Sequence, residues 1–248
     1  MDNEISQLNA ISDEYPFEKS LIEVVSRLDA VELSELLTTV VEGVHSPERR
    51  RFYLVFLIAQ VKYRIVEESR AAEVYNLLAG AGKAYCGRIF IAAKPHRVAS
   101  AGQGRSELAD MSLGHRIWKA RLHDRRLLES LATDSNPRVI RNWLANPATT
   151  ELQVLSLASR RPIEVSSLLE IISNTRWSVR PEVQAALARN PYSPPNISSS
   201  LLPLLGTKLL REIAKDGSLH PMAQQTAAEL LRNLTWGADR QSSCGESP

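Results

Sequence analysis

The sequence predicts an all-α protein whose C-terminal half is built from stacked helical repeats. The main observation is a pattern that occurs twice, at residues 136–147 and again 44 positions later at 180–191. Both copies begin with a proline at their second position, continue with apolar residues at helical spacing and close with Asn-Pro. Proline costs nothing at the first helical position and cannot continue a helix, so each copy indicates one helix between two turns. A fixed period in this range is typical of helical repeat arrays.

Residues 1–92 form a predicted N-terminal helical region. Apolar side chains recur at spacings of three and four from 17 to 44, which indicates two amphipathic helices with a break near Asp29. Ser46 and Pro47 then provide an N-cap and a first-turn proline for a helix that we expect to run to about Ser69. A further helix, residues 71–78, is expected to stop at Gly80.

Three further segments follow. Residues 93–114 contain three glycines and almost no apolar periodicity, which predicts a flexible linker. Residues 115–236 form the predicted repeat domain, in which 117–132 is expected to be one helix, Thr150 caps the helix after the first copy, and Pro221 opens a third, looser copy. Residues 237–248 are small and polar and are expected to form a disordered tail.

Composition and hydropathy point to a cytoplasmic protein that does not associate with membranes. The chain has 248 residues, of which 44% are hydrophobic and 23% charged, as in ordinary globular proteins. Its most apolar stretch, residues 52–59, is too short to cross a bilayer and is followed by Lys62 and Arg64. The acidic start of the chain also differs from the basic start of a signal peptide.

Charge is distributed unevenly along the chain. Residues 1–50 carry 4 basic and 11 acidic side chains, whereas residues 93–127 carry 8 basic and 3 acidic ones. This polarity indicates either contact between the acidic front and the basic middle or two different partners.

The sequence predicts neither an enzyme nor a metal or cofactor site. Cys86 and Cys244 lie far apart without a Cys-x-x-Cys pair, which argues against a disulfide framework or a zinc site. His115 and His123 would lie about 12 Å apart along a helix, too far to share one metal. The glycines near Lys83 resemble a phosphate loop only superficially, because Ala84 lacks the hydroxyl that would hold magnesium. Hydrolase motifs such as Gly-x-Ser-x-Gly are absent.

The second copy of the pattern carries a family resemblance. At residues 179–195, which include Arg180-Pro181-Glu182-Val183 and Asn190-Pro191, the chain resembles the leucine-rich-variant and HEAT-like helical repeats of bacteria. More broadly, residues 127–231 resemble bacterial proteins in which Asn-Pro and Arg-Arg-Pro turns alternate in the same order. The resemblance covers less than half of the chain and implies an α-solenoid with a concave face, a fold used mostly for binding. It carries over no catalytic residue, and without a cysteine group it implies no iron–sulfur cluster.

The favoured function is therefore a non-enzymatic scaffold that binds a protein or peptide partner through its repeat surface. Arg160 and Arg161 precede Pro162 at the turn between two helices, and two more arginines bracket a tryptophan one helix later. We expect the four arginines to cluster on one edge of the stack, where the planar guanidinium suits carboxylates. The predicted partner-binding residues are Arg160, Arg161, Arg176, Trp177 and Arg180.

The alternative function is nucleic-acid binding, in the manner of the HEAT-like alkylpurine DNA glycosylases that wrap duplex DNA. Its candidate residues are seven arginines with two tryptophans as stacking groups: Arg138, Arg141, Arg160, Arg161, Arg176, Arg180, Arg189, Trp143 and Trp177. Repeat alignment argues against it, because Arg138 aligns with Glu182 and Arg141 with Ala185. Residues 128–190 also carry 7 basic and 6 acidic side chains, without the excess that a phosphate-binding groove needs. Trp143 aligns with Leu187, which indicates a core position.

Overall fold

The computed structural model describes residues 2–98 and 110–243, and within these ranges the regular structure is helical, without a strand. None of the helices in the described part is long and apolar enough to span a membrane. The N-terminal region comprises α1 (Asp2–Asn9), α2 (Glu14–Arg27), α3 (Ala30–Glu42), α4 (Pro47–Tyr63), α5 (Glu68–Gly80) and the 3-10 helix η1 (Ala84–Phe90). The remaining elements are α6 (Leu113–Lys119), α7 (Arg125–Leu131), α8 (Pro137–Ala145), α9 (Glu151–Ser159), α10 (Val165–Ile172), α11 (Thr175–Ser178), α12 (Pro181–Ala188), α13 (Pro195–Leu201), the 3-10 helix η2 (Leu202–Leu204), α14 (Thr207–Lys215) and α15 (Pro221–Ser243).

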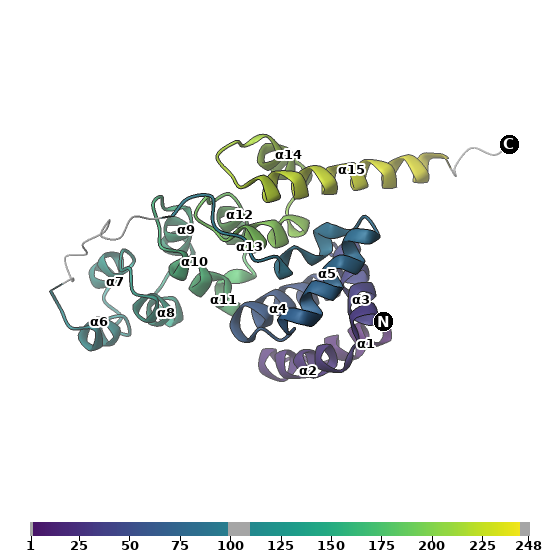
Figure 1. Cartoon of the computed structure of the whole chain (residues 1–248). Helices are drawn as coiled ribbons and strands as arrows, with labels where there is room; N and C mark the ends of the chain where they lie inside the picture. Colours follow the sequence, from purple (N-terminus) through teal and green to yellow (C-terminus); the bar gives the residue numbers. More distant parts are fainter. Residues whose placement is uncertain (1, 99–109, 244–248) are drawn as a thin grey trace.

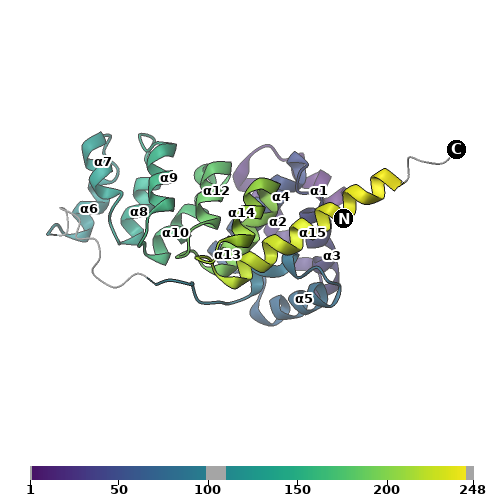
Figure 2. The same ribbon diagram turned by 90° about the horizontal axis from the view of Figure 1, so that it is seen from above.

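The helices after residue 110 lie in two rows. In Figure 2, α7, α9, α12 and α14 follow one another in one row, and α6, α8 and α10 follow one another beside it. Contacts between α9 and α12, between α6 and α8, and between α8 and α10 hold neighbours together within the rows. Figure 1 shows α6 and α7 at one end of the molecule and the N-terminal helices toward the other.

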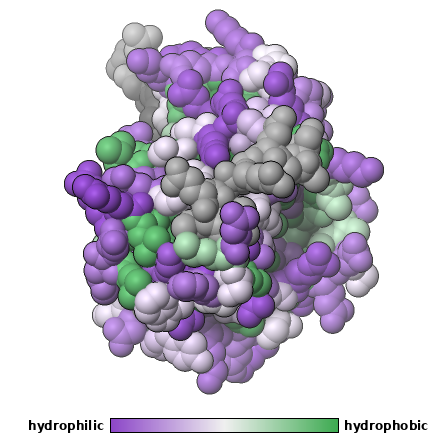
Figure 3. Space-filling view, turned by 90° about the vertical axis from the view of Figure 1, so that its left-hand side faces the viewer, coloured by the Kyte–Doolittle hydropathy of each residue, from purple (hydrophilic) through white to green (hydrophobic). Residues whose placement is uncertain are grey.

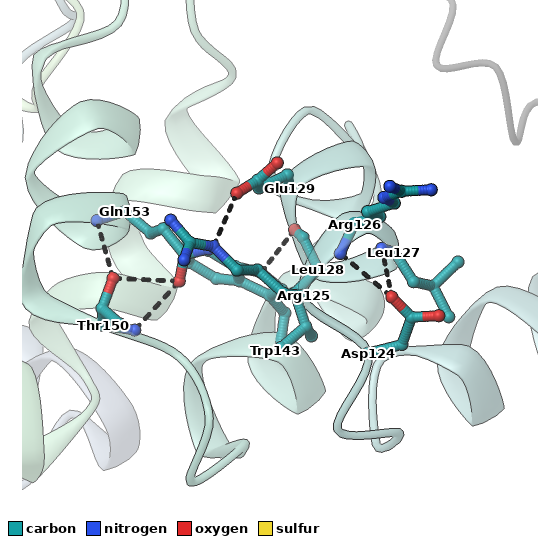
Figure 4. A network of polar contacts seen from close by, with 9 residues as sticks. All are labelled: Asp124, Arg125, Arg126, Leu127, Leu128, Glu129, Trp143, Thr150 and Gln153. Atoms are coloured by element: carbon teal, nitrogen blue, oxygen red, sulfur yellow. Dashed lines mark hydrogen bonds and ion pairs between the residues drawn. The ribbon is translucent and has the colours of Figure 1, made fainter.

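Local sequence signals set most of the helix starts. The predicted break near Asp29 is confirmed, because α2 ends at Arg27 and Asp29 forms a capping box with Glu32 at the start of α3. Pro47, Pro137 and Pro181 each occupy the first turn of a helix as expected. Thr150 caps α9 through a reciprocal pair of hydrogen bonds with Gln153, shown in Figure 4.

Two buried amides join neighbouring helices at the Asn-Pro turns. The Asn146 side chain donates to the carbonyls of Ala120 and Leu122, both at 2.9 Å, just beyond the end of α6. The Asn190 side chain does the same to Ala158 and Arg160, at 2.7 and 3.1 Å, at the end of α9. The carbonyl oxygen of each side chain accepts the backbone N–H two residues later. The repeated Asn-Pro pattern therefore encodes bonds between helices as well as helix ends.

Three predicted boundaries differ from the structure. The helix expected to reach Ser69 ends at Tyr63, because Arg64 adopts a left-handed conformation at its C-cap. The single helix expected over 117–132 is divided into α6 and α7, and Asp124 caps the second of them. The tail predicted from residue 237 is helical up to Ser243, since one glycine costs only about 1 kcal/mol in a helix. Residues 244–248 lie outside the described part.

The predicted flexible linker is only partly described. Residues 99–109 lie outside the described ranges, and α6 begins at Leu113, inside the predicted linker. Within residues 93–98, the backbone N–H of Arg97 donates to the carbonyl of Pro191, in the turn after α12, at 3.2 Å. Residues 93–98 are therefore bonded to the turn after α12.

The N-terminal helices and the later helices share one continuous hydrophobic core. The Tyr53 hydroxyl, buried in α4, donates to the carbonyl of Ser200 in α13 at 2.8 Å. Arg88, also buried, forms a two-pronged ion pair with Glu229 of α15 and donates to the Thr226 hydroxyl. Because charged groups are buried only when they are paired, these contacts fix the two regions against each other.

Candidate functional site

The predicted partner-binding arginines do not gather at one place. Arg176 donates to the carbonyls of Asn146, Pro147 and Thr149, immediately before the start of α9. Arg160 and Arg161 follow the other end of α9, which is nine residues long and so spans about 13 Å. The expected cluster of four arginines on one edge is therefore corrected: the pairs lie at opposite ends of this helix.

Trp177 is buried and has a structural role. Its side chain is 2% exposed, and its indole N–H donates to the carbonyl of Leu144 at 2.8 Å. The Arg176 guanidinium lies 4.2 Å from the centre of its ring. Trp177 therefore presents no exposed ring to a partner, which corrects its predicted place among the contact residues.

Of the other predicted contact residues, Arg161 is also engaged within the chain. Its guanidinium donates to the carbonyl of Arg189 at 2.6 Å, at the end of α12. A cation at this position suits the negative end of a helix dipole. Arg180 is exposed and Arg160 half-buried, and neither has a side-chain partner among the described residues. Because α9 and α12 lie side by side, with Arg161 joining their C-terminal ends, Arg160 and Arg180 occupy opposite ends of this pair.

The residues proposed for nucleic-acid binding are also largely committed to the fold. Trp143 is fully buried, and its indole N–H donates to the carbonyl of Leu128 at 2.9 Å, as Figure 4 shows. The core position expected from its alignment with Leu187 is confirmed. Arg141 forms a two-pronged ion pair with Glu170. Neither tryptophan is available to stack on a base.

A cleft lies elsewhere, between the N-terminal helices and the helices α14 and α15. It has a volume of about 590 Å³ and lies beside α3, the turn after α5, η2, α14 and α15. Its apolar lining includes Val41, Val44, Ala81, Pro203, Leu205, Leu210 and Leu230. Glu42, His45, Lys83 and Asn233 add polar groups. An apolar lining with a few polar groups is the usual layout of a binding site.

The turn after α5 places the polar groups of this cleft. The helix stop expected at Gly80 is confirmed, and Gly82 follows with a φ of 72°, which a residue with a side chain rarely adopts. This reversal brings the Lys83 ammonium to within 2.7 Å of the Glu42 carboxylate. The Tyr85 hydroxyl donates to the same carboxylate oxygen at 3.3 Å. Two neighbours thus hold one oxygen of this carboxylate.

Tyr85 and the neighbouring Cys86 both have raised pKa values. Burial, with smaller contributions from Cys86 and Glu42, raises the pKa of Tyr85 above its ordinary value. Burial and the nearby Glu42 carboxylate raise the pKa of the Cys86 thiol to about 12. At neutral pH the buried thiol therefore stays protonated, whereas a reactive cysteine needs a lowered pKa. In the described ranges, no group of three or more His, Cys, Asp or Glu side chains is placed to hold a metal ion.

Sequence reasoning did not find this cleft. Its lining comes from segments separated by more than 100 residues, and each apolar residue also fits an ordinary helix face. The only local signal was the glycine-containing stop after α5, interpreted as the end of a helix. Comparisons with family models, curated proteins and solved structures find no match to the chain.

Proposed function

We propose that the protein is a non-enzymatic helical-repeat scaffold that binds a segment of a protein partner in the cleft between α3, α5, α14 and α15. The two rows of helices after residue 110 form, in this proposal, a HEAT-like α-solenoid that the N-terminal helices close at one end. The repeated bonds of Asn146 and Asn190 support the repeat architecture, because each joins one helix end to the next in the same way. The cleft carries the functional part of the proposal.

The chemistry of the cleft fits a peptide segment with apolar anchors. Protein interfaces combine an apolar centre with a polar rim, and the lining follows that layout. Leu205, Leu210 and Leu230 are nearly buried and supply apolar contact. The oppositely charged Glu42 and Lys83 offer hydrogen-bond acceptors and donors to a peptide backbone. Because the polar groups bear both signs, the partner segment needs no strong net charge.

Substitution of Ala81 provides a test that leaves the core intact. Ala81 lines the cleft and is exposed, with backbone angles that any residue tolerates. Ala81→Trp should fill the cleft and abolish recovery of the partner in an affinity experiment followed by mass spectrometry. Ala79→Trp is the matched control, because Ala79 is exposed on the same turn but does not line the cleft. Equal recovery by both variants would refute the cleft as the binding site.

Treatment with nuclease distinguishes the proposed protein binding from the alternative function, nucleic-acid binding. A nucleic-acid-binding protein would lose its partners after nuclease, whereas a peptide-binding scaffold retains them. We expect nuclease to leave recovery of the partner protein unchanged. We also expect duplex DNA to bind this protein with a Kd on the order of 10⁻⁵ M or weaker at physiological salt. The burial of Trp143 and Trp177 supports this expectation, since neither can stack on a base. Submicromolar, strongly salt-dependent DNA binding would instead support the alternative.

A further inference from the structure

The acidic and basic parts of the chain lie at opposite ends of the molecule. Figures 1 and 2 both show α6 and α7 at one end, and α3 and α5 far from them toward the other. The described basic side chains of α6 and α7 therefore do not pair with the acidic side chains of α3 and α5 within one chain. Some charges at each end are paired locally, such as Arg116 with Asp134 and Lys83 with Glu42, and others have no side-chain partner in the described part of the chain.

The basic end carries arginines that its own fold does not explain. Arg125 and Arg126 are the first two residues of α7, where the helix dipole disfavours positive charge. Arg125 is paired only with Glu129 on the same exposed helix, and Arg126 has no side-chain partner in the described part of the chain. Removing these charges should therefore change the stability of the fold little, because the exposed pair of Arg125 with Glu129 contributes only about 0.2–0.5 kcal/mol. Their placement points to a role in binding.

The same end also exposes apolar surface. Trp118 in α6 is 54% exposed, and α6 has no buried residue at all. Figure 3, which looks onto this end, shows a mainly hydrophilic surface interrupted by hydrophobic patches. The terminal unit of a repeat array normally has a polar outer face. Exposed tryptophan and arginine side chains at one end of the molecule are instead residue types enriched in interface hot spots.

The opposite end presents a complementary surface on α3 and α5. Glu32 and Glu68 lie in the first turns of their helices, where the dipole explains them. Glu35 and Glu73 have no such explanation, since both lie further along, are exposed and have no side-chain partner within the described ranges. Val31, one turn before Glu35, is 51% exposed.

We propose that the protein associates with itself end to end: the α6–α7 end of one copy, with Trp118, Arg125 and Arg126, docks on the α3–α5 surface of the next, with Val31, Glu35 and Glu73. The two surfaces differ and lie at opposite ends, so the contact is heterologous and leaves one free end of each kind. Such contacts produce open chains that lengthen with concentration. This inference uses other surfaces than the cleft and does not depend on the proposed function.

Sedimentation of the full chain over a range of concentrations tests this proposal. At about 0.1 M salt we expect assemblies that grow with concentration, and at about 1 M salt largely monomer, because the Debye length falls from about 10 Å to about 3 Å. Arg125→Gln/Arg126→Gln and Glu35→Gln/Glu73→Gln should each be monomeric. Lys208→Gln/Arg211→Gln, the same change of charge on exposed residues of α14, should assemble like the natural chain.

A mixture of the two monomeric variants gives the sharpest result. The arginine variant keeps its α3–α5 surface and the glutamate variant keeps its α6–α7 end, so together they can form one contact and no more. We expect a 1:1 dimer that does not grow further. Circular dichroism and melting of each variant establish that it is folded. Monomer at every concentration and salt for the natural chain would overturn the proposal, as would unchanged assembly of both variants. Binding of an oligonucleotide or another protein by Arg125 and Arg126, without self-association, would also overturn it.

Discussion

The N-terminal helices and the short helices after residue 110 are stabilised in different ways. Helices α2, α3, α4 and α5 have 13 to 17 residues, whereas α8, α9, α10, α12 and α14 have 8 or 9. Isolated helices shorter than about 12–15 residues are marginal in water. The long helices can rely on extended apolar faces, but each short helix buries only a few side chains. The short helices after residue 110 are held in addition by side-chain hydrogen bonds that run from one helix to the end of another.

These cross-helix bonds recur at equivalent positions. Asn146 and Asn190 each bind two carbonyls of a neighbouring helix end. Thr149 and Ser193, three residues later, donate to the carbonyls of Trp143 and Leu187 at 2.6 and 2.7 Å. The turn at Asp216 differs: its carboxylate accepts from Ser218, and Gln224 donates to the nearby carbonyls. An aspartate side chain has no N–H to donate to a neighbouring helix, so this turn, which precedes the third copy at Pro221, lacks the link.

The largest effect on the free energy of unfolding is expected from substituting Asn146 or Asn190. Asn190→Ala leaves the carbonyls of Ala158 and Arg160 and the N–H of Tyr192 without their partner, and each unsatisfied buried group costs about 1–3 kcal/mol. We expect a loss of about 3 kcal/mol in the free energy of unfolding, measured by urea denaturation, and a similar loss for Asn146→Ala. Asn76→Ala, at an exposed position of α5, should change it by less than about 0.5 kcal/mol. A loss below about 1 kcal/mol for both buried asparagines would contradict their role as links between helices.

Substitution of the buried tryptophans should have an intermediate effect on the free energy of unfolding. Trp177→Phe keeps most of the apolar volume but removes the N–H that binds the carbonyl of Leu144, which should cost about 1–2 kcal/mol. Trp143→Phe removes the equivalent bond to Leu128 and should cost about the same. Trp118→Phe is the control, because that side chain is exposed and its substitution should be nearly neutral. Equal stability of all three variants would show that the indole hydrogen bonds contribute little.

Periodicity and capping predicted most helices, because those signals act within a few residues. Asp29, Thr150 and Pro181 start helices in the structure where the sequence indicated. The end of α4 could not be predicted, since its left-handed residue is Arg64 and not glycine. The break between α6 and α7 depends on Asn146, which binds carbonyls 24 and 26 residues earlier. That contact exists only after the helices have stacked.

The candidate site was less predictable than the helices. Sequence reasoning chose arginines near turns, but Arg176 and Arg161 bind backbone carbonyls of neighbouring turns. Whether an arginine is free for a partner depends on which carbonyls the fold brings beside it. The cleft depends in the same way on tertiary structure, because Val41 and Leu230 meet only when the chain has folded.

The smallest expected effect on stability is a pH dependence at the turn before α15, where no asparagine side chain binds a neighbouring helix end. His220 accepts the N–H of Met222 through Nδ1 at 3.1 Å, which requires that this nitrogen carry no proton. Burial and the nearby His96, whose ring centre is 6.3 Å away, lower the pKa of His220. The folded chain therefore binds a proton less readily than the unfolded chain, so the contribution of His220 is complete above its ordinary pKa of about 6.5 and is lost as pH falls below it. His220→Asn keeps an acceptor without a titrating group. We expect the melting temperature of the natural chain to fall relative to this variant between about pH 7 and pH 5, and a constant difference across that range would contradict the assignment.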